Sequence, residues 1–281
     1  MKKDLKPIER DTPRMQKAKR YGWLTKLPII KQIFRKKHHP RGFDVEAGQI
    51  LPMNLNVGDY ENEAVPLKLM DHFIEKAGTI VLMSCPCRNT NNCQNHSIEL
   101  GCIWMGKGAA NLDLKKLPGM VKDGRYATKE EAKEHARLAL KNGLVPALGK
   151  LRGDAQVYKV LDYEDEFMNF CFCCNCCCVV AGMKYINSDH KKYIKRMKGV
   201  TVTTDPEKCD GCGDCFKVCI YDGLKMVKGK AVHTKDCIGC GHCEIVCPNG
   251  AVSINFDENM NIDEVMDEII QRYEKIVDIS G

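Results

Sequence analysis

Residues 209–219 read CDGCGDCFKVC, and residues 237–247 read CIGCGHCEIVC, followed by Pro248. Both segments have the spacing C-x2-C-x2-C-x3-C. Loops this short let three thiolates converge on one side of a metal cluster, and the intervening glycines let backbone N–H groups approach the sulfur atoms. A zinc site would have two C-x2-C pairs separated by a longer loop, so the third cysteine of each run argues against zinc. The repeated spacing indicates iron–sulfur clusters.

Over residues 199–256 these two runs make the chain resemble the bacterial-type dicluster ferredoxin domain. The resemblance implies two [4Fe-4S] clusters in which the fourth cysteine of each run ligates the other cluster. It also implies a pseudo-twofold pair of repeats. Ile220 stands where the family often has proline, so we expect altered packing around Cys219 with the ligand retained. The implied ligands are Cys209, Cys212, Cys215 and Cys247 for cluster 1, and Cys219, Cys237, Cys240 and Cys243 for cluster 2.

The first half of the chain carries ten further cysteines, six of them in the stretch CFCCNCCC at 171–178. A cubane takes four ligands. Ten thiols therefore allow two four-iron clusters with two thiols spare, or one larger cluster with an unfilled iron site. We interpret residues 171–178 as a wall shared between clusters, with individual assignments open. The candidate ligands are Cys85, Cys87, Cys93, Cys102, Cys171, Cys173, Cys174, Cys176, Cys177 and Cys178.

Arg88 follows Cys87 directly in the sequence. A guanidinium in this position can donate hydrogen bonds to a cluster or neutralise its charge. A surface ion pair is the alternative use for this arginine.

The order CxCR, CxCCxCCC and dicluster ferredoxin over residues 50–256 resembles a group of Cys-rich ferredoxin-like proteins of anaerobic bacteria and archaea. This resemblance implies a redox function that uses iron–sulfur clusters, and it does not indicate a substrate.

The cysteines are expected to be reduced. Met1 is followed by a basic polar segment with no apolar region typical of a secretory signal, and adjacent cysteines cannot easily bridge each other. Dense thiols and exposed clusters are sensitive to oxidation, which favours an anaerobic, cytoplasmic setting. No run of 18 apolar residues occurs, so we expect no membrane span.

Positive charge is concentrated near the N-terminus. Residues 1–41 contain 14 Lys or Arg and three acidic residues, a net charge of +11, whereas the whole chain carries +6. Apolar residues such as Trp23 and Ile33 alternate with these charges. The pattern predicts contact with an anionic membrane surface or an acidic protein, and packing on the chain's own core is the alternative. Because the remainder of the chain is acidic, we expect no nucleic acid partner.

Periodicity predicts a helix over residues 66–78, a buried strand over 79–83, and a helix that begins at a capping box of Thr128 and Glu131. A last amphipathic helix is expected to pack on the body of the protein. The predicted class is α+β, with a Cys-rich α/β iron–sulfur domain followed by a ferredoxin-like dicluster domain. The predicted divisions are 1–43 (basic arm), 44–198 (Cys-rich domain), 199–256 (ferredoxin domain) and 257–281 (terminal helix).

Three functions fit these features. The first is an electron-transfer protein that relays low-potential electrons to a partner redox enzyme, and cluster multiplicity favours it. The second is a reductase whose N-terminal cluster has an open site for a disulfide, a sulfur compound or a corrinoid. The third is a metal or sulfur carrier or assembly factor. Whether the chain is an enzyme is left open, with an electron carrier favoured over an iron–sulfur oxidoreductase.

Overall fold

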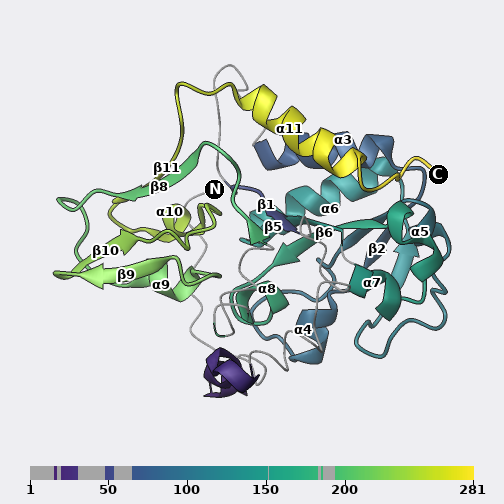
Figure 1. Ribbon diagram of the computed structural model, residues 1–281, viewed down its shortest axis with the longest axis horizontal. Helices are drawn as coiled ribbons and strands as arrows, with labels where there is room; N and C mark the ends of the chain where they lie inside the picture. Colours follow the sequence, from purple (N-terminus) through teal and green to yellow (C-terminus); the bar gives the residue numbers. More distant parts are fainter. Residues whose placement is uncertain are drawn as a thin grey trace.

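The computed structural model describes residues 16–17, 20–30, 48–53, 65–150, 152–182, 185 and 194–281. Within these residues the chain forms a larger part around one seven-stranded sheet and a smaller part with two two-stranded sheets (Figure 1). Helices and strands are mixed in both parts, so the predicted α+β class is confirmed.

The strand order of the large sheet is β4-β2-β3-β6-β5-β1-β7. Among the described strands only the β1 and β7 pair is parallel, and the other neighbours are antiparallel. β6 lies in the middle, so the first half of the cysteine stretch 171–178 lies at the centre of the sheet. The strands are β1 Gly48–Ile50, β2 Ile80–Met83, β3 Ile103–Met105, β4 Gly124–Tyr126, β5 Val145–Gly149, β6 Met168–Cys173 and β7 Ile194–Lys195.

One face of this sheet is covered by α3 (Val65–Lys76), α6 (Lys129–Lys141) and α11 (Ile262–Glu274), as Figure 1 shows. The predicted capping box begins α6: the Thr128 side chain accepts a hydrogen bond from the Glu131 N–H, and the Glu131 carboxylate accepts one from the Thr128 N–H. The apolar side of α3, which includes Met70 and Phe73, is buried against the strands. The helices and the buried strand expected from periodicity are confirmed.

The opposite face carries a second apolar cluster beneath α5 (Lys107–Ala110), α7 (Arg152–Val157) and the 3-10 helix η2 (Leu161–Glu166). Side chains alternate across a strand, so Ile103 and Met105 join the first cluster whereas Trp104 joins the second. Trp104 stacks on Phe167 with the ring centroids 4.6 Å apart. The short helices α4 (Pro86–Thr90) and α8 (Val179–Gly182) lie on this side of the sheet (Figure 1).

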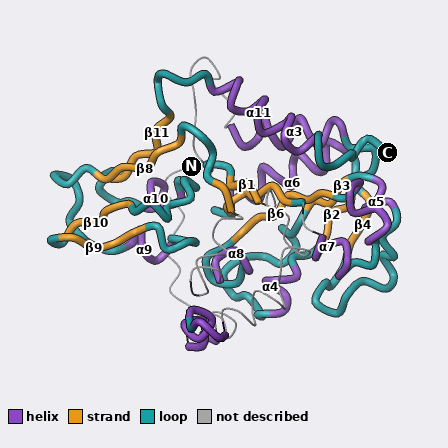
Figure 2. The backbone as a smooth tube through the Cα atoms, in the orientation of Figure 1, coloured by secondary structure: helices purple, strands orange, loops and turns teal. Residues whose placement is uncertain are grey.

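The smaller part contains the sequence strand, helix, strand twice, joined by loops (Figure 2). β8 (Val200–Thr204) pairs antiparallel with β11 (Val252–Phe256), and β9 (Leu224–Val227) pairs with β10 (Lys230–His233). The helices α9 (Asp214–Val218) and α10 (His242–Val246) lie in contact with each other. This order agrees with a duplicated unit, and the exact pseudo-twofold relation stays a prediction.

After β11 the chain returns to the larger part, where α11 lies beside α3 (Figure 1). Glu274 pairs with Lys76 at 2.8 Å, and the Tyr273 hydroxyl donates to the Leu148 carbonyl at 3.1 Å. The expected packing of the terminal helix on the body is confirmed. The smaller part is therefore enclosed, in sequence, by two segments of the larger part, while the predicted domain limits stay a prediction.

Most of the basic arm lies outside the described residues. The described segment contains the 3-10 helix η1 (Gly22–Lys26), and the side chains of Trp23, Leu27 and Ile29 are exposed. Membrane or partner contact through residues 1–41 stays a prediction. No helix in the part of the chain that the structure describes is long and apolar enough to cross a membrane.

We predict that Tyr273→Ala destabilises the larger part by about 3–5 kcal/mol, because it empties a fully buried aromatic site and leaves the Leu148 carbonyl without its donor. Chemical denaturation under anaerobic conditions measures the change. Gln271→Ala on the exposed side of α11 is the control and should lie within about 0.5 kcal/mol of the parent protein. Equal stability of the two variants would contradict this role of α11.

Candidate metal centres

The eight cysteines of the smaller part surround two cavities. One cavity is lined by Cys209, Cys212, Cys215 and Cys247, and we call it site 1. The other is lined by Cys219, Cys237, Cys240 and Cys243, and we call it site 2. The structure thus brings together the two sets implied by the ferredoxin resemblance, including the exchange of the fourth cysteine between repeats.

Tight glycine turns form the walls of these cavities. Gly211 and Gly213 have φ angles of +79° and +82°, which L side chains rarely adopt. A Cβ on Gly211 would also lie 2.2 Å from the Gly229 carbonyl oxygen. Glycine is therefore required where the loop folds tightly around site 1.

Backbone N–H groups point at the sulfur of the two crossing cysteines. The Gly223 N–H donates to Cys219 Sγ at 3.3 Å, and the Ala251 N–H donates to Cys247 Sγ at 3.2 Å. Such N–H···S bonds stabilise thiolates bound to iron. The two sites share this feature because each crossing cysteine occupies the same place after its short helix.

Burial makes a free thiolate costly in both cavities. Desolvation raises the pKa of Cys215 to about 11 and that of Cys240 to about 12. Metal cations supply the charge that would let these thiols ionise inside the protein. Four convergent sulfurs, glycine turns and buried thiols fit a cubane cluster at each site. Cys212 is exposed, so site 1 lies nearer to solvent than site 2.

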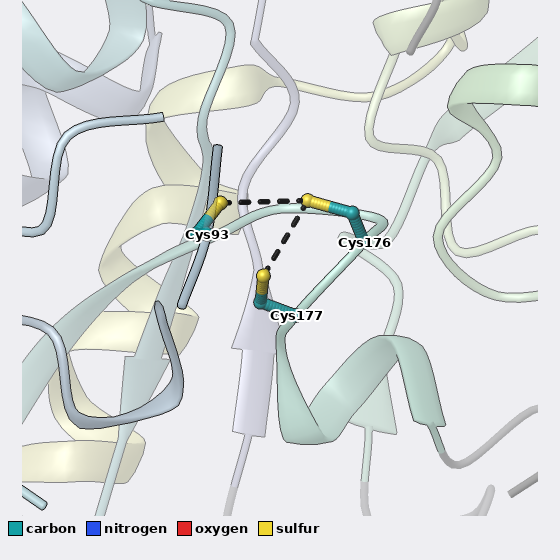
Figure 3. Close-up of side chains that lie close together, drawn as sticks. All are labelled: Cys93, Cys176 and Cys177. Carbon is teal, nitrogen blue, oxygen red and sulfur yellow. Dashed lines mark hydrogen bonds between the residues drawn. The ribbon is translucent and has the colours of Figure 1, made fainter. Parts of the chain in front are cut away.

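The ten cysteines of the larger part divide into two groups. The first group consists of Cys93, Cys174, Cys176 and Cys177, and Figure 3 shows three of its members. Cys176 Sγ lies 3.8 Å from Cys93 Sγ and 3.6 Å from Cys177 Sγ. Hydrogen bonds, the strongest from Cys174, hold the pKa of Cys93 below its usual value. Four soft sulfur ligands in this arrangement suit a cubane.

The second group contains the other six thiols. Cys178 Sγ lies 3.1 Å from Cys173 Sγ, and Cys102 Sγ lies 3.5 Å from Cys171 Sγ. The hydrogen bond to Cys173, followed by that to Cys87 and by burial, raises the pKa of Cys178 well above its usual value. The members are Cys85, Cys87, Cys102, Cys171, Cys173 and Cys178.

Local structure explains this division. Cys85 follows β2 and caps α4, where its sulfur accepts the Arg88 N–H at 3.5 Å. Residues 171–173 are strand, and a turn follows before α8. Because of this turn, Cys174, Cys176 and Cys177 lie in the first group, whereas Cys178 lies in the second. The stretch 171–178 therefore contributes three thiols to each group.

Arg88 is fully buried and close to both groups. Its guanidinium donates to the carbonyls of Phe172, at 2.9 Å, and Leu100, while Nε has no partner among the described residues. Burial alone would lower its pKa, but the negative charge that nearby cysteines carry when ionised outweighs that effect and raises it. These cysteines are Cys85, Cys174, Cys102 and Cys178. The surface ion pair considered for Arg88 is excluded by this burial.

Site 2 faces the larger part. The Met53 N–H donates to the Cys240 carbonyl at 2.9 Å, and the Asn175 amide donates to the Lys217 carbonyl. His242, between two cysteines of site 2, lies close to His96, and burial together with this neighbour lowers the pKa of His242 to about 4. Sequence reasoning missed His242, because its position at the start of α10, between two cysteines, gives no signal of contact with the other part.

Two comparisons bear on these sites. Residues 201–248 match the family model described as a 4Fe-4S dicluster domain. No curated protein matches the chain. The matched segment contains all eight cysteines of sites 1 and 2. [4Fe-4S] clusters are therefore the cofactor of this iron–sulfur chain, and the assignment of individual cysteines stays a prediction.

We predict that Cys219→Ser and Cys237→Ser remove the same cluster signal, because both cysteines line site 2. Cys247→Ser and Cys209→Ser should remove the other signal in the same way. Electron paramagnetic resonance of the dithionite-reduced protein measures this. If Cys219→Ser and Cys209→Ser gave the same loss, the exchange of the fourth cysteine would be wrong.

We also predict that Arg88→Gln shifts the reduction potential of an N-terminal cluster to a more negative value, because removal of a buried cation disfavours added electrons. Each 1.4 kcal/mol of lost stabilisation corresponds to about 59 mV for a one-electron couple, and we expect at least this much. Redox titration measures it, with the exposed Arg137→Gln as control. Unchanged potentials in both variants would refute this role.

Proposed function

We propose that this chain is a multi-cluster electron-transfer protein that carries low-potential electrons through four consecutive cluster sites to a partner redox enzyme. Electrons enter at site 1 and pass through site 2 to the first thiol group and then to the second. The matched dicluster segment and the chain's many cysteines support the iron–sulfur electron-transfer function. The further clusters and the partner enzyme belong to the proposal.

The observation that carries the proposal is the continuity of the thiol sets. The helices α9 and α10, which carry Cys215 of site 1 and Cys243 of site 2, lie in contact. On the other side of site 2, the charge of His96 acts on His242, and His96 follows Cys93 of the first group by three positions. Arg88 lies near both groups. Neighbouring sites in this order suit one-electron transfer between clusters.

The solvent exposure of the cysteines supports entry of electrons at site 1. The eight cysteines of site 1 and site 2 include one exposed member, Cys212 at site 1, whereas the thiols of the larger part are buried or half-buried. Asp210 and Asp214 also line site 1. A donor protein with a basic surface would therefore approach site 1, since opposite charges steer association.

The six-thiol second group keeps the reductase alternative open, because it holds two thiols more than a cubane needs. A cluster with an open iron site there would bind small ligands. A closed cluster with four cysteine ligands would not.

We predict about sixteen iron and sixteen sulfide per chain in protein purified without oxygen, corresponding to four cubanes. Metal and sulfide analysis with electron paramagnetic resonance measures this content. The paired change Cys176→Ser with Cys177→Ser should remove about four iron from the first group, while Asn175→Ser, directly before them in the chain, is the matched control and should retain the iron.

About eight iron in the parent protein would refute the four-site path, because sites 1 and 2 alone account for that number. A signal from the larger part that shifts on addition of cyanide or a thiol would favour the reductase. Sixteen iron with no ligand-sensitive signal supports electron transfer.

A further inference from the structure

Two cysteines of the second group are placed differently from the other four. Cys171 lies on β6, and Cys102 directly precedes β3. Because Ile103 pairs with Phe170, extension of this register by one residue places Cys102 opposite Cys171. Both side chains contact the apolar cluster beneath α7, so the two cysteines face each other where β3 begins.

This geometry suits a disulfide. Directly opposed residues of antiparallel strands have Cα atoms about 4.5–5.5 Å apart, which falls within the range that disulfides require. The two sulfurs already lie 3.5 Å apart as free thiols. Formation of a bond needs only a small approach of the sulfur atoms.

Cys171 has a hydrogen-bond partner outside the thiol groups. Its Sγ donates to Asn169 Oδ1 at 3.1 Å, and Asn169 Nδ2 donates to Asp154 Oδ2 at 3.0 Å. This contact holds the Cys171 side chain against its own strand, next to Cys102.

The remaining four thiols form a connected set without this pair. Cys85 contacts Cys87, Cys87 contacts Cys178, and Cys178 lies 3.1 Å from Cys173. Four is the number of ligands that a cubane takes. The pair still adjoins this set, because Cys102 is electrostatically coupled to Cys85 and Cys171 to Cys173.

We propose that Cys102 and Cys171 are a dithiol–disulfide redox pair rather than iron ligands, and that this pair exchanges electrons with the cluster held by the other four thiols. The inference rests on the proposed cluster sites. Reduction of the disulfide breaks the Sγ–Sγ bond, takes one electron from each of two reduced [4Fe-4S] clusters of the path and takes two protons from solvent. Two thiols result. Oxidation reverses each transfer.

Such a pair would let the proposed chain of clusters deliver two electrons together with two protons. Clusters carry one electron each, whereas a dithiol carries two together with two protons. Cys171 is partly exposed, which permits proton exchange. Asp154 beside Asn169 is half-buried, and desolvation raises its pKa to about 7, which limits the negative charge near the pair.

The test begins with iron content, measured without oxygen. Cys102→Ser and Cys171→Ser should each retain the full iron and sulfide of the parent protein. The matched control Cys178→Ser should lose about four iron, because Cys178 belongs to the ligand set. Loss of iron in either variant of the pair would overturn the inference.

The second measurement is made on the unaltered protein. After oxidation with ferricyanide, acid quenching and alkylation, mass spectrometry should detect a Cys102–Cys171 cross-linked peptide, and dithionite treatment should abolish it. A reductive titration should consume two more electrons per chain than the double variant Cys102→Ser with Cys171→Ser. The disulfide inference would be overturned, and the proposed function would stand, if the parent protein held its full iron content but gave no cross-linked peptide. The same holds if the parent protein and the double variant consumed equal numbers of electrons. An iron content of about eight in the parent protein would overturn the proposed function and, with it, the electron source of the pair.

Discussion

The cost of burying negative sulfur determines most of this architecture. Ten cysteines of the larger part lie on a strand, at strand ends and in turns around β6, and most of them are buried. An ionised thiol in such surroundings is strongly disfavoured unless a cation compensates it. Arg88 supplies one positive charge between the two groups, and the clusters proposed there would supply the rest. In that proposal, cluster binding and completion of the core are coupled.

The region around the ten cysteines of the larger part also contacts the smaller part. Contacts from Met53 and Asn175 to the smaller part lie beside the thiols, so sites 1 and 2 are held against the larger part rather than left on a free module. The seven-stranded sheet supports these sites. Three helices cover its first face, and Cys102 and Cys171 contact the apolar cluster on its second face. Fixed spacing between neighbouring sites suits electron transfer.

Local sequence motifs predicted the structure around them well, whereas contacts between residues far apart in the sequence were not predicted. The resemblance to dicluster ferredoxins implied the cysteine sets that line sites 1 and 2, and the capping box of Thr128 specifies a helix start locally. The division of residues 171–178 could not be predicted, because it depends on where β6 ends and how the turn orients Cys174 and Cys178. The roles of Asn169 and His242 were missed for a related reason, since Asp154 beside Asn169 and His96 beside His242 belong to other elements of the chain.

The return of α11 has a consequence for how the protein is made. Translation produces both cysteine repeats before residues 262–274, so α11, one of the three helices that cover the first face of the sheet, leaves the ribosome after both repeats. Until then the face of the sheet that receives Tyr273 lacks part of its cover. A nascent chain must hold this incomplete core while both repeats emerge and fold. Synthesis thus imposes an order in which the ferredoxin-like segment precedes closure of the domain that surrounds it in sequence.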